Sequence, residues 1–406
     1  MIFSLLSWLL IWGGMFTDVT YINSPLFPSD FHTLFQGIRA FFPLLALYFC
    51  FMWVLFRRAR FPFFKDPLGF LFAYGGLGVA ISLILSSDPW RSAYWAAIYV
   101  APFMVLWMVY VGEDSLRRLK IIINLNYFVF FFLTFSLLPS ALRLGKGLAV
   151  ISQFYKLPFG LGVVNRNGVG RYALIVIIVS AVRLISYHNI RRWLWLLPIF
   201  PAGFLLAQTE SRTALLGLAM ITVVFFLLKG INLRFLLLAP AALFLVYTVG
   251  FRTRAQGNLN QLVYLSGREA AWNQGFQWIK ESPLLGWGFH ADRIMMNEAH
   301  MHNSYLHAAI QEGGIGFILF AAAIVGIWAL MLLKNVFKVS RHLEGQDQVL
   351  LMESVLIVAF LTSRSFFEST AAFYGVDLLL LIPAMAFISM MLREPDTPET
   401  EPEAIA

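Results

Sequence analysis

Residues 305–333 have the sequence YLHAAIQEGGIGFILFAAAIVGIWALMLL, an apolar run whose charged and titratable positions, His307 and Glu312, both lie near its start. About 20 mostly apolar residues in a helix cross a bilayer, so this stretch predicts a membrane-spanning helix. Of the 406 residues of the chain, 59% are hydrophobic and 13% are charged, against about 25% charged residues in soluble domains. The apolar runs are continuous and lack the two-residue alternation of barrel strands. The sequence therefore predicts an all-α polytopic membrane protein.

The other apolar runs, separated by charged breaks, bring the prediction to about twelve transmembrane helices. They lie near residues 1–16, 32–56, 68–85, 92–112, 121–139, 171–187, 193–208, 213–228, 235–250, 305–333, 349–362 and 371–392. We expect residues 1–392 to form a single transmembrane domain. The first run has no basic start and no small-residue cleavage site, so we interpret it as a retained helix rather than a signal peptide. Residues 393–406 are acidic and proline-rich, which predicts a disordered tail.

The loops between these helices alternate in charge, and this predicts the orientation of the chain. By the positive-inside rule the short basic loops lie in the cytoplasm, and an even number of helices puts both termini there as well. The basic residues of these loops are Arg57, Arg58, Arg60, Lys65, Arg117, Arg118, Lys120, Arg191, Arg192, Lys229, Arg234, Lys334, Lys338 and Arg341. The segments on the opposite side, periplasmic in a bacterium, are 140–170, 209–212, 251–303 and 363–370.

The longest outer segment, about 251–303, forms a long loop between the ninth and tenth predicted helices. Together the outer segments are nearly as basic as the inner loops, which runs against the topological preference and favours a role in ligand binding. Arginine suits a phosphate because its planar guanidinium donates two parallel hydrogen bonds and keeps its charge. We predict an anion-binding cluster from arginines near outer helix ends, namely Arg166, Arg171, Arg212, Arg268 and Arg364.

Each of these arginines also has a simpler interpretation. It can mark the water interface of the membrane or form a local ion pair. Arg212 lies close in sequence to Glu210, and Arg364 lies close to Glu368. The sequence leaves both interpretations open for these residues.

Four of the seven histidines lie within residues 290–307: His290, His300, His302 and His307. Histidine near its ordinary pKa can take a proton from an attacking hydroxyl group, which is general-base chemistry. His302 is the favoured base, because Asn303 and then the start of a helix follow it. The alternatives are interfacial histidines or a metal site at His300 and His302, but this run has no Asp or Cys at ligand spacing. We therefore predict no metal and no cofactor.

The acidic residues of the predicted helices and two tryptophans of the outer loop have both a functional and a structural interpretation. Glu312 lies about two turns into its helix, and an ionisable residue there is a functional candidate, although it can equally hold a neighbouring arginine. Glu353 and Asp377 are interpreted as structural partners. Trp272 and Trp287 can stack on sugar rings or belong to the aromatic belt of the membrane interface.

Several of these residues stand in motifs that resemble the O-antigen ligase and polymerase superfamily, most strongly over about residues 205–320. Upstream only residues 165–168, Asn-Arg-Asn-Gly, are suggestive. The motifs are Ser211-Arg212-Thr213-Ala214-Leu215, Gly267-Arg268, Trp272, Pro283-Leu284-Leu285-Gly286-Trp287-Gly288, His302-Asn303-Ser304-Tyr305-Leu306 and Glu312-Gly313-Gly314.

The resemblance implies a metal-independent, inverting glycosyltransferase of the GT-C type, with its catalytic domain in the bacterial inner membrane and its active site on the periplasmic side. The donor would be a glycan on undecaprenyl diphosphate. By the same resemblance, His302, Arg268 and Arg212 are the expected catalytic residues. Further donor or substrate contacts are expected from Arg166, Arg171, Arg364, Asn303, Glu312 and Trp272.

The compact chain and its single dominant outer loop favour a ligase, which accepts a lipid A core sugar. The alternative within the superfamily is a polymerase of O-antigen or exopolysaccharide, which accepts another lipid-linked repeat. The alternative of another class is a transporter of lipid-linked oligosaccharides. A transporter places polar residues near the bilayer midplane and on both sides of it, whereas here they gather at one face. The expected partners are the lipid-linked donor, the core or glycan acceptor and membrane lipids, and no nucleic acid.

Overall fold

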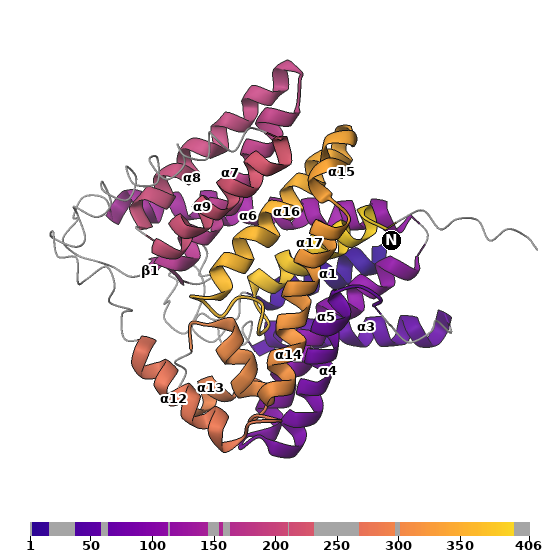
Figure 1. The fold of residues 1–406 in the computed structure, drawn as a ribbon, viewed down its shortest axis with the longest axis vertical. Coiled ribbons are helices and arrows are strands. Elements are labelled where there is room, and N and C mark those ends of the chain that lie inside the picture. The colour runs from indigo at the N-terminus through magenta and orange to yellow at the C-terminus, as the bar shows by residue number, and fades with distance from the viewer. Residues whose placement is uncertain are drawn as a thin grey trace, which may run out of the picture.

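The computed structural model describes residues 2–15, 37–57, 64–112, 114–144, 154–156, 163–209, 211–230, 268–296 and 301–393. Over these residues the chain is almost entirely helical (Figure 1). One short antiparallel ribbon joins β1 (Phe154–Lys156) to β2 (Val163–Asn165), with Phe154 opposite Asn165. The prediction of an all-α polytopic membrane protein is confirmed.

In chain order, and with the labels of Figure 1, the helices are α1 (Ile2–Gly14), α3 (Phe42–Arg57), α4 (Leu68–Leu85), α5 (Pro89–Val111), α6 (Ser115–Leu144), α7 (Arg166–Ser186), η2 (Ile190–Trp195), α8 (Leu196–Thr209), α9 (Arg212–Lys229), α12 (Arg268–Glu281), α13 (Ala291–Met295), α14 (Ser304–Leu333), α15 (Val336–His342), α16 (Gly345–Ser365) and α17 (Val376–Met391).

Nine helical segments of the described chain are long and apolar enough to cross a membrane, and α1 and α17 are shorter apolar helices. Together they correspond to eleven of the twelve spans expected from the sequence. The remaining span, near 235–250, lies outside the described residues, so the total of twelve stays a prediction. The polar block at 251–303 contains two helices, α12 and α13, in its described part.

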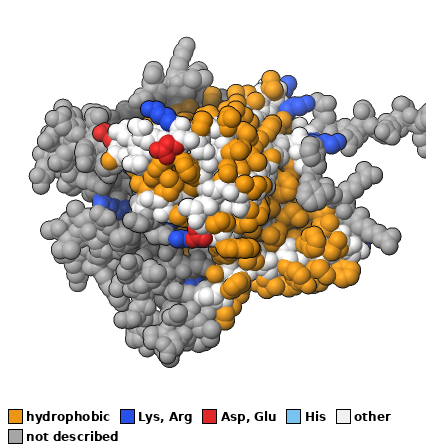
Figure 2. Space-filling model, turned by 90° about the horizontal axis from the view of Figure 1, so that it is seen from below, with side chains coloured by type: hydrophobic (Ala, Val, Ile, Leu, Met, Phe, Trp, Pro, Cys, Tyr) orange, Lys and Arg blue, Asp and Glu red, His pale blue; other side chains and the backbone are white. Residues whose placement is uncertain are grey.

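Large hydrophobic side chains cover much of the outside of the bundle. Trp90 and Leu333 are each 83% exposed and Phe56 is 79% exposed. Figure 2 shows hydrophobic side chains spread over a broad part of the described surface. In water such an area favours aggregation, whereas in a bilayer it is the surface that contacts lipid.

The centre of the bundle is occupied by α16 and α17. In Figure 1 they lie between α6, α7 and α9 on one side and α4, α5 and α14 on the other, and they contact members of both groups. Of an apolar 18-residue stretch of α16, 83% is buried. The segment 366–375, which joins these two helices, is therefore held between the two halves of the molecule.

Four helices begin at the same end of the bundle, which we call the site face: α7, α9, α14 and α17. Three of them have a side-chain cap. The side-chain oxygens of Asn165, Ser211 and Asn303 accept hydrogen bonds from the first turns of α7, α9 and α14, respectively. Because the N-terminus of a helix carries a partial positive charge, this arrangement favours an anion at the site face.

The helix α14 is broken at Glu312 and Gly313, where the backbone leaves helical geometry. The loop 283–288 fills the break. The N–H groups of Trp287 and Gly288 donate to the carbonyls of Ile310 and Gln311 at 3.0 and 2.8 Å, and that of Gly314 donates to Pro283 at 2.7 Å. Irregular backbone near a membrane is tolerated where protein satisfies its polar groups, as it does here.

Glycine is required at two positions of this contact. Gly286 has φ 68°, and an added Cβ would stand 2.5 Å from the carbonyl oxygen of Ile310. Gly313 has φ 62°, and its Cβ would stand 2.2 Å from the carbonyl carbon of Leu284. Both the left-handed backbone and the close approach exclude larger residues. The two glycine motifs of the sequence thus form one structural unit, which joins the segment containing α12 and α13 to α14.

Candidate functional site

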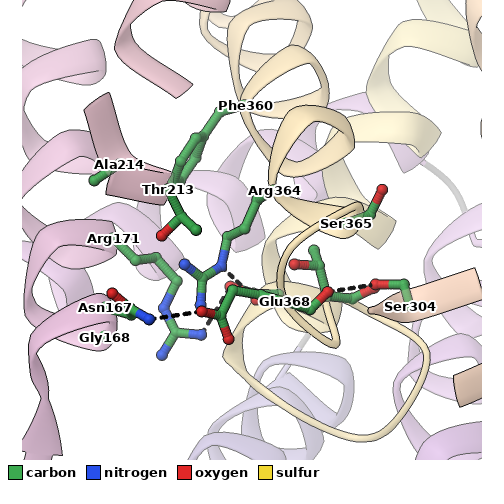
Figure 3. A network of polar contacts seen from close by, with 12 residues as sticks. Asn167, Gly168, Arg171, Thr213, Ala214, Ser304, Phe360, Arg364, Ser365 and Glu368 are labelled. Carbon is green, nitrogen blue, oxygen red and sulfur yellow. Dashed lines mark hydrogen bonds and ion pairs between the residues drawn. The ribbon is translucent and has the colours of Figure 1, made fainter. Parts of the chain in front are cut away.

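Glu368, in the segment between α16 and α17, lies at the centre of a polar cluster on the site face. Its Oε1 accepts hydrogen bonds from Nδ2 of Asn167 at 2.6 Å and from Nη2 of Arg268 at 3.0 Å. Its Oε2 lies 3.0 Å from Nδ1 of His302. Figure 3 shows Asn167 of α7, Arg364 of α16 and Glu368 of the segment after α16 turned toward one another. We call Asn167, Arg268, His302 and Glu368 the Glu368 centre.

The Glu368 carboxylate is held ionised by its surroundings. It is only 6% exposed, and burial by itself raises the pKa of a carboxyl group. The hydrogen bond and charge of His302 and the charges of Arg364 and Arg268 outweigh that effect and lower the pKa to about 2. An ionised carboxylate only accepts hydrogen bonds, so Nδ1 of His302 carries the hydrogen and Nε2 is the ring nitrogen that can accept a proton.

His302 is held firmly in an unusual backbone conformation. Its φ is 50°, in the left-handed region, which costs a residue other than glycine about 1–2 kcal/mol. The chain on both sides is fixed: the indole N–H of Trp272 donates to the carbonyl of Met301 at 2.7 Å, and Nδ2 of Asn303 donates to the carbonyl of Phe366 at 3.1 Å. Ser304 Oγ bonds to the carbonyls of Glu368 and Thr370. The His302 side chain remains 32% exposed.

A second carboxylate, Asp377 at the start of α17, holds two more arginines. Its Oδ1 lies 2.9 Å from Nη1 of Arg171, and its Oδ2 lies 3.3 Å from Nε of Arg364. Arg364 thus pairs with Asp377, while its charge also acts on Glu368. Nη1 of Arg364 and Nε of Arg171 are buried and have no hydrogen-bond partner within the described residues.

The starts of α7 and α9 are joined to this cluster. Ser211 Oγ donates to Oδ1 of Asn167 at 3.0 Å, and Arg212 follows Ser211 as the first residue of α9, with an exposed side chain. Arg166 is the first residue of α7 and is partly buried. The structure thus places all five predicted arginines at or beside one site, on segments that are far apart in the sequence.

Three other predicted substrate contacts have structural surroundings of their own. Asn303 caps α14 with its oxygen, at 2.9 Å from the N–H of Leu306, and Trp272 bonds to the carbonyl of Met301. Both therefore fix the position of His302. Glu312 lies apart, fully buried in the break of α14, where neither carboxylate oxygen has a hydrogen-bond partner among the described residues.

Sequence reasoning missed the central position of Glu368, which it considered only as a local partner of Arg364. The one available signal was that Glu368 is the single acidic residue of the outer segment 363–370. Asp377, interpreted from the sequence as a structural partner, does hold two arginines.

No group of three His, Cys, Asp or Glu side chains in the described part of the chain is arranged to hold a metal ion. His300, which the alternative metal site needs, lies outside the described residues.

Fold and site together define a multi-pass membrane protein with a cationic site, a histidine and a buried carboxylate at one face. Residues 194–321 match the family model described as O-antigen ligase. The matched segment includes Arg212, Arg268 and His302, and it confirms the resemblance to the O-antigen ligase and polymerase superfamily. It supports an O-antigen ligase-like function, which in this family is glycosyltransferase-like and uses lipid-linked glycans. No curated protein matches the chain.

Proposed function

We propose that this protein is an O-antigen ligase, which transfers a glycan from undecaprenyl diphosphate to a sugar of the lipid A core. The observation that carries the proposal is the Glu368 centre, where one ionised carboxylate holds both a partly exposed histidine and an arginine. The alternative within the superfamily, a polymerase, would use the same donor site with a different acceptor.

The site face suits the diphosphate of the donor. Arg166 has no ion-pair partner among the described residues, and Arg212 is exposed on the start of α9. Arg268 shares Glu368 with His302, so it lies next to the proposed base. Arginines and helix N-termini beside a departing diphosphate stabilise the negative charge that grows on it.

The chemistry follows from the orientation of His302. Nε2 takes the proton of the acceptor hydroxyl group. At the same time the oxygen of that hydroxyl group forms a bond to the anomeric carbon of the donor sugar. The bond from that carbon to the diphosphate oxygen breaks, and undecaprenyl diphosphate leaves with the electron pair. Attack from the side opposite the leaving group inverts the anomeric centre. The ionised Glu368 stabilises the imidazolium that forms, in the way a buried carboxylate supports a catalytic histidine.

The charge pattern supports a periplasmic site in the bacterial inner membrane. The ends of α9 and α14 away from the site face carry Lys229 and Lys334, and the basic segment 336–342 follows. By the positive-inside rule that end is cytoplasmic, which favours a periplasmic position for the site face and the Glu368 centre and a cytoplasmic one for both termini.

The test is a reconstitution of the full chain in liposomes with undecaprenyl-diphosphate glycan. Lipid A core is supplied in one arm and a second lipid-linked repeat in the other, each with and without EDTA. We expect transfer to the core that EDTA does not reduce. Elongation of the second repeat alone would assign a polymerase. No transfer in either arm, with movement of the intact lipid-linked glycan across the bilayer, would assign a transporter. Loss in EDTA that zinc restores would contradict the metal-independent mechanism.

A further inference from the structure

A second cluster of cationic and aromatic side chains lies on the site face, away from the Glu368 centre. The Arg293 guanidinium of α13 stands 4.9 Å over the ring of Phe373, in the segment 366–375. The half-buried Trp95 of α5 stacks on His290 with ring centroids 4.1 Å apart, and His290 lies 5.9 Å from Phe373. We call Arg293, Phe373, Trp95 and His290 the Arg293 cluster.

Arg293 differs from Arg171, Arg268 and Arg364, each of which has a carboxylate partner. It forms no ion pair within the described residues, and its Nε is buried without a hydrogen-bond partner there. The neighbouring Asp292 is paired with His307 instead. Its Oδ2 lies 2.7 Å from Nδ1 of His307, and both side chains are fully buried.

The charge of the cluster comes from arginine rather than from histidine. Burial, followed by the charge of Arg293, lowers the pKa of His290 well below its ordinary value, so His290 is neutral. Arg91, exposed in the first turn of α5, adds positive charge nearby. A guanidinium backed by an aromatic ring, with unused donors, is suited to an anionic group on a planar or ring-shaped ligand.

The Arg293 cluster shares two chain segments with the Glu368 centre. The segment 366–375 carries Glu368 near one end and Phe373 near the other. The segment from α13 to α14 carries Arg293 and His302, and the N–H of Met301 donates to Oδ2 of Asp292 at 3.4 Å. This contact brings α13 beside the residue that precedes His302, so a ligand held by Arg293 lies on the same face as the proposed base.

We propose that the Arg293 cluster binds a phosphorylated sugar of the acceptor glycan, with Arg293 on the phosphate and the partly exposed rings of Trp95 and Phe373 against the sugar. This assignment rests on the proposed glycosyl transfer at His302 and names the acceptor side of the same site. The acceptor class is thus an anionic oligosaccharide rather than a neutral one.

The test measures binding without transfer. The full chain in phosphatidylcholine nanodiscs is titrated calorimetrically with a lipid-free core oligosaccharide that bears phosphate monoesters, and with the same oligosaccharide after phosphatase treatment. We expect tighter binding of the phosphorylated form. Arg293→Gln should weaken it by about tenfold to a hundredfold, the effect of losing a charged hydrogen-bond donor. Lys280→Gln, in the last turn of α12, is the control and should leave binding unchanged.

Each outcome decides the assignment. Equal binding of the two oligosaccharides by the wild type, or wild-type binding by Arg293→Gln, overturns it. If Arg293→Gln does not fold, Arg293→Lys keeps the charge and loses the planar fork, and should bind with intermediate affinity. If the oligosaccharide binds in phosphatidylcholine nanodiscs but not in phosphatidylglycerol nanodiscs, the cluster is assigned to lipid headgroups instead. A wild type that discriminates but does not transfer would contradict the proposed function and leave this inference standing.

Discussion

Glu353 and Glu368 are both buried carboxylates that hold an arginine, and their surroundings differ. Within the bundle, Glu353 of α16 accepts from Nε of Arg183 at 2.7 Å, and Nη2 of Arg183 also donates to Asn124 at 2.8 Å. The Arg183 guanidinium is covered by the rings of Trp195 and Tyr127. At the site face, Glu368 combines an arginine, an amide and a histidine, and the histidine remains partly exposed.

These two regions show that a buried ion pair does not by itself indicate function. Arg183 is bonded through Nε and Nη2 to protein groups on two other helices, which is the arrangement of a structural tie between helices. The Glu368 centre keeps an exposed acid–base group, and nearby Arg364 has a buried donor without a partner among the described residues. A partly exposed histidine beside the buried carboxylate, rather than burial or charge alone, distinguishes the site.

The largest expected effect separates these two regions. Arg268→Ala should lower the transfer rate by about a hundredfold to a thousandfold, because a group that stabilises the leaving diphosphate is lost. Arg183→Ala should leave the rate of the folded protein unchanged but lower its stability by about 3 kcal/mol, since it leaves Glu353 buried without its cation. Transfer kinetics and thermal unfolding in detergent measure both. If the transfer rate falls for Arg183→Ala but not for Arg268→Ala, the assignment of the two regions is reversed.

The next effect concerns the break in α14, which joins the segment containing α12 and α13 to the membrane. Gly313→Ala should destabilise the protein by about 3 kcal/mol, because the left-handed backbone and the Leu284 carbonyl both oppose a Cβ. Gly314→Ala is the matched control: its Cβ would stand 3.2 Å from the carbonyl oxygen of Pro283, and we expect a change within about 1 kcal/mol. Similar unfolding midpoints for the two variants would contradict the requirement for glycine.

A somewhat smaller effect depends on pH. The pKa of Glu368, about 2 in the folded protein, is lower than its ordinary value of about 4.3. The carboxylate therefore contributes up to about 3 kcal/mol of stability at neutral pH, which is lost as the pH falls from about 5 to 2. The stability difference between the wild type and Glu368→Gln should thus shrink between pH 6 and pH 3. A constant difference for Glu368→Gln over this range would contradict the ionised state of Glu368.

The smallest effect tests the role of Trp272. Trp272→Phe keeps an aromatic ring but removes the hydrogen bond to the Met301 carbonyl, which is worth about 1 kcal/mol. We expect kcat to fall severalfold with KM for the acceptor unchanged, since the backbone at His302 is loosened. Trp272→Leu, which also removes the ring, should behave the same way. If KM for the acceptor rises for Trp272→Leu but not for Trp272→Phe, stacking of Trp272 on a sugar ring is favoured.

The sequence predicted the structure best in the membrane-spanning helices, because the thickness of the bilayer sets their length. The length of a crossing fixes each apolar run, so the boundaries of α4, α9 and α14 follow closely from hydropathy. The candidate arginines and His302 were found through motifs and charge. Their anchors were not, because Glu368 meets His302 across 66 residues and Asn167 across 201 residues. Local patterns carry no information on such contacts, nor on the meeting of Gly286 with the break at Gly313.

Catalysis by His302 within the Glu368 centre is the core of the proposed function. Single-turnover transfer from undecaprenyl-diphosphate glycan to lipid A core, with the donor saturating, measures it directly for the wild type and for His302→Ala. His342→Ala, an exposed histidine at the opposite end of the bundle, is the control. We expect a loss of about a hundredfold to ten-thousandfold for His302→Ala and wild-type rates for His342→Ala. A folded His302→Ala protein that transfers within about tenfold of the wild type would contradict the role of this histidine as the base.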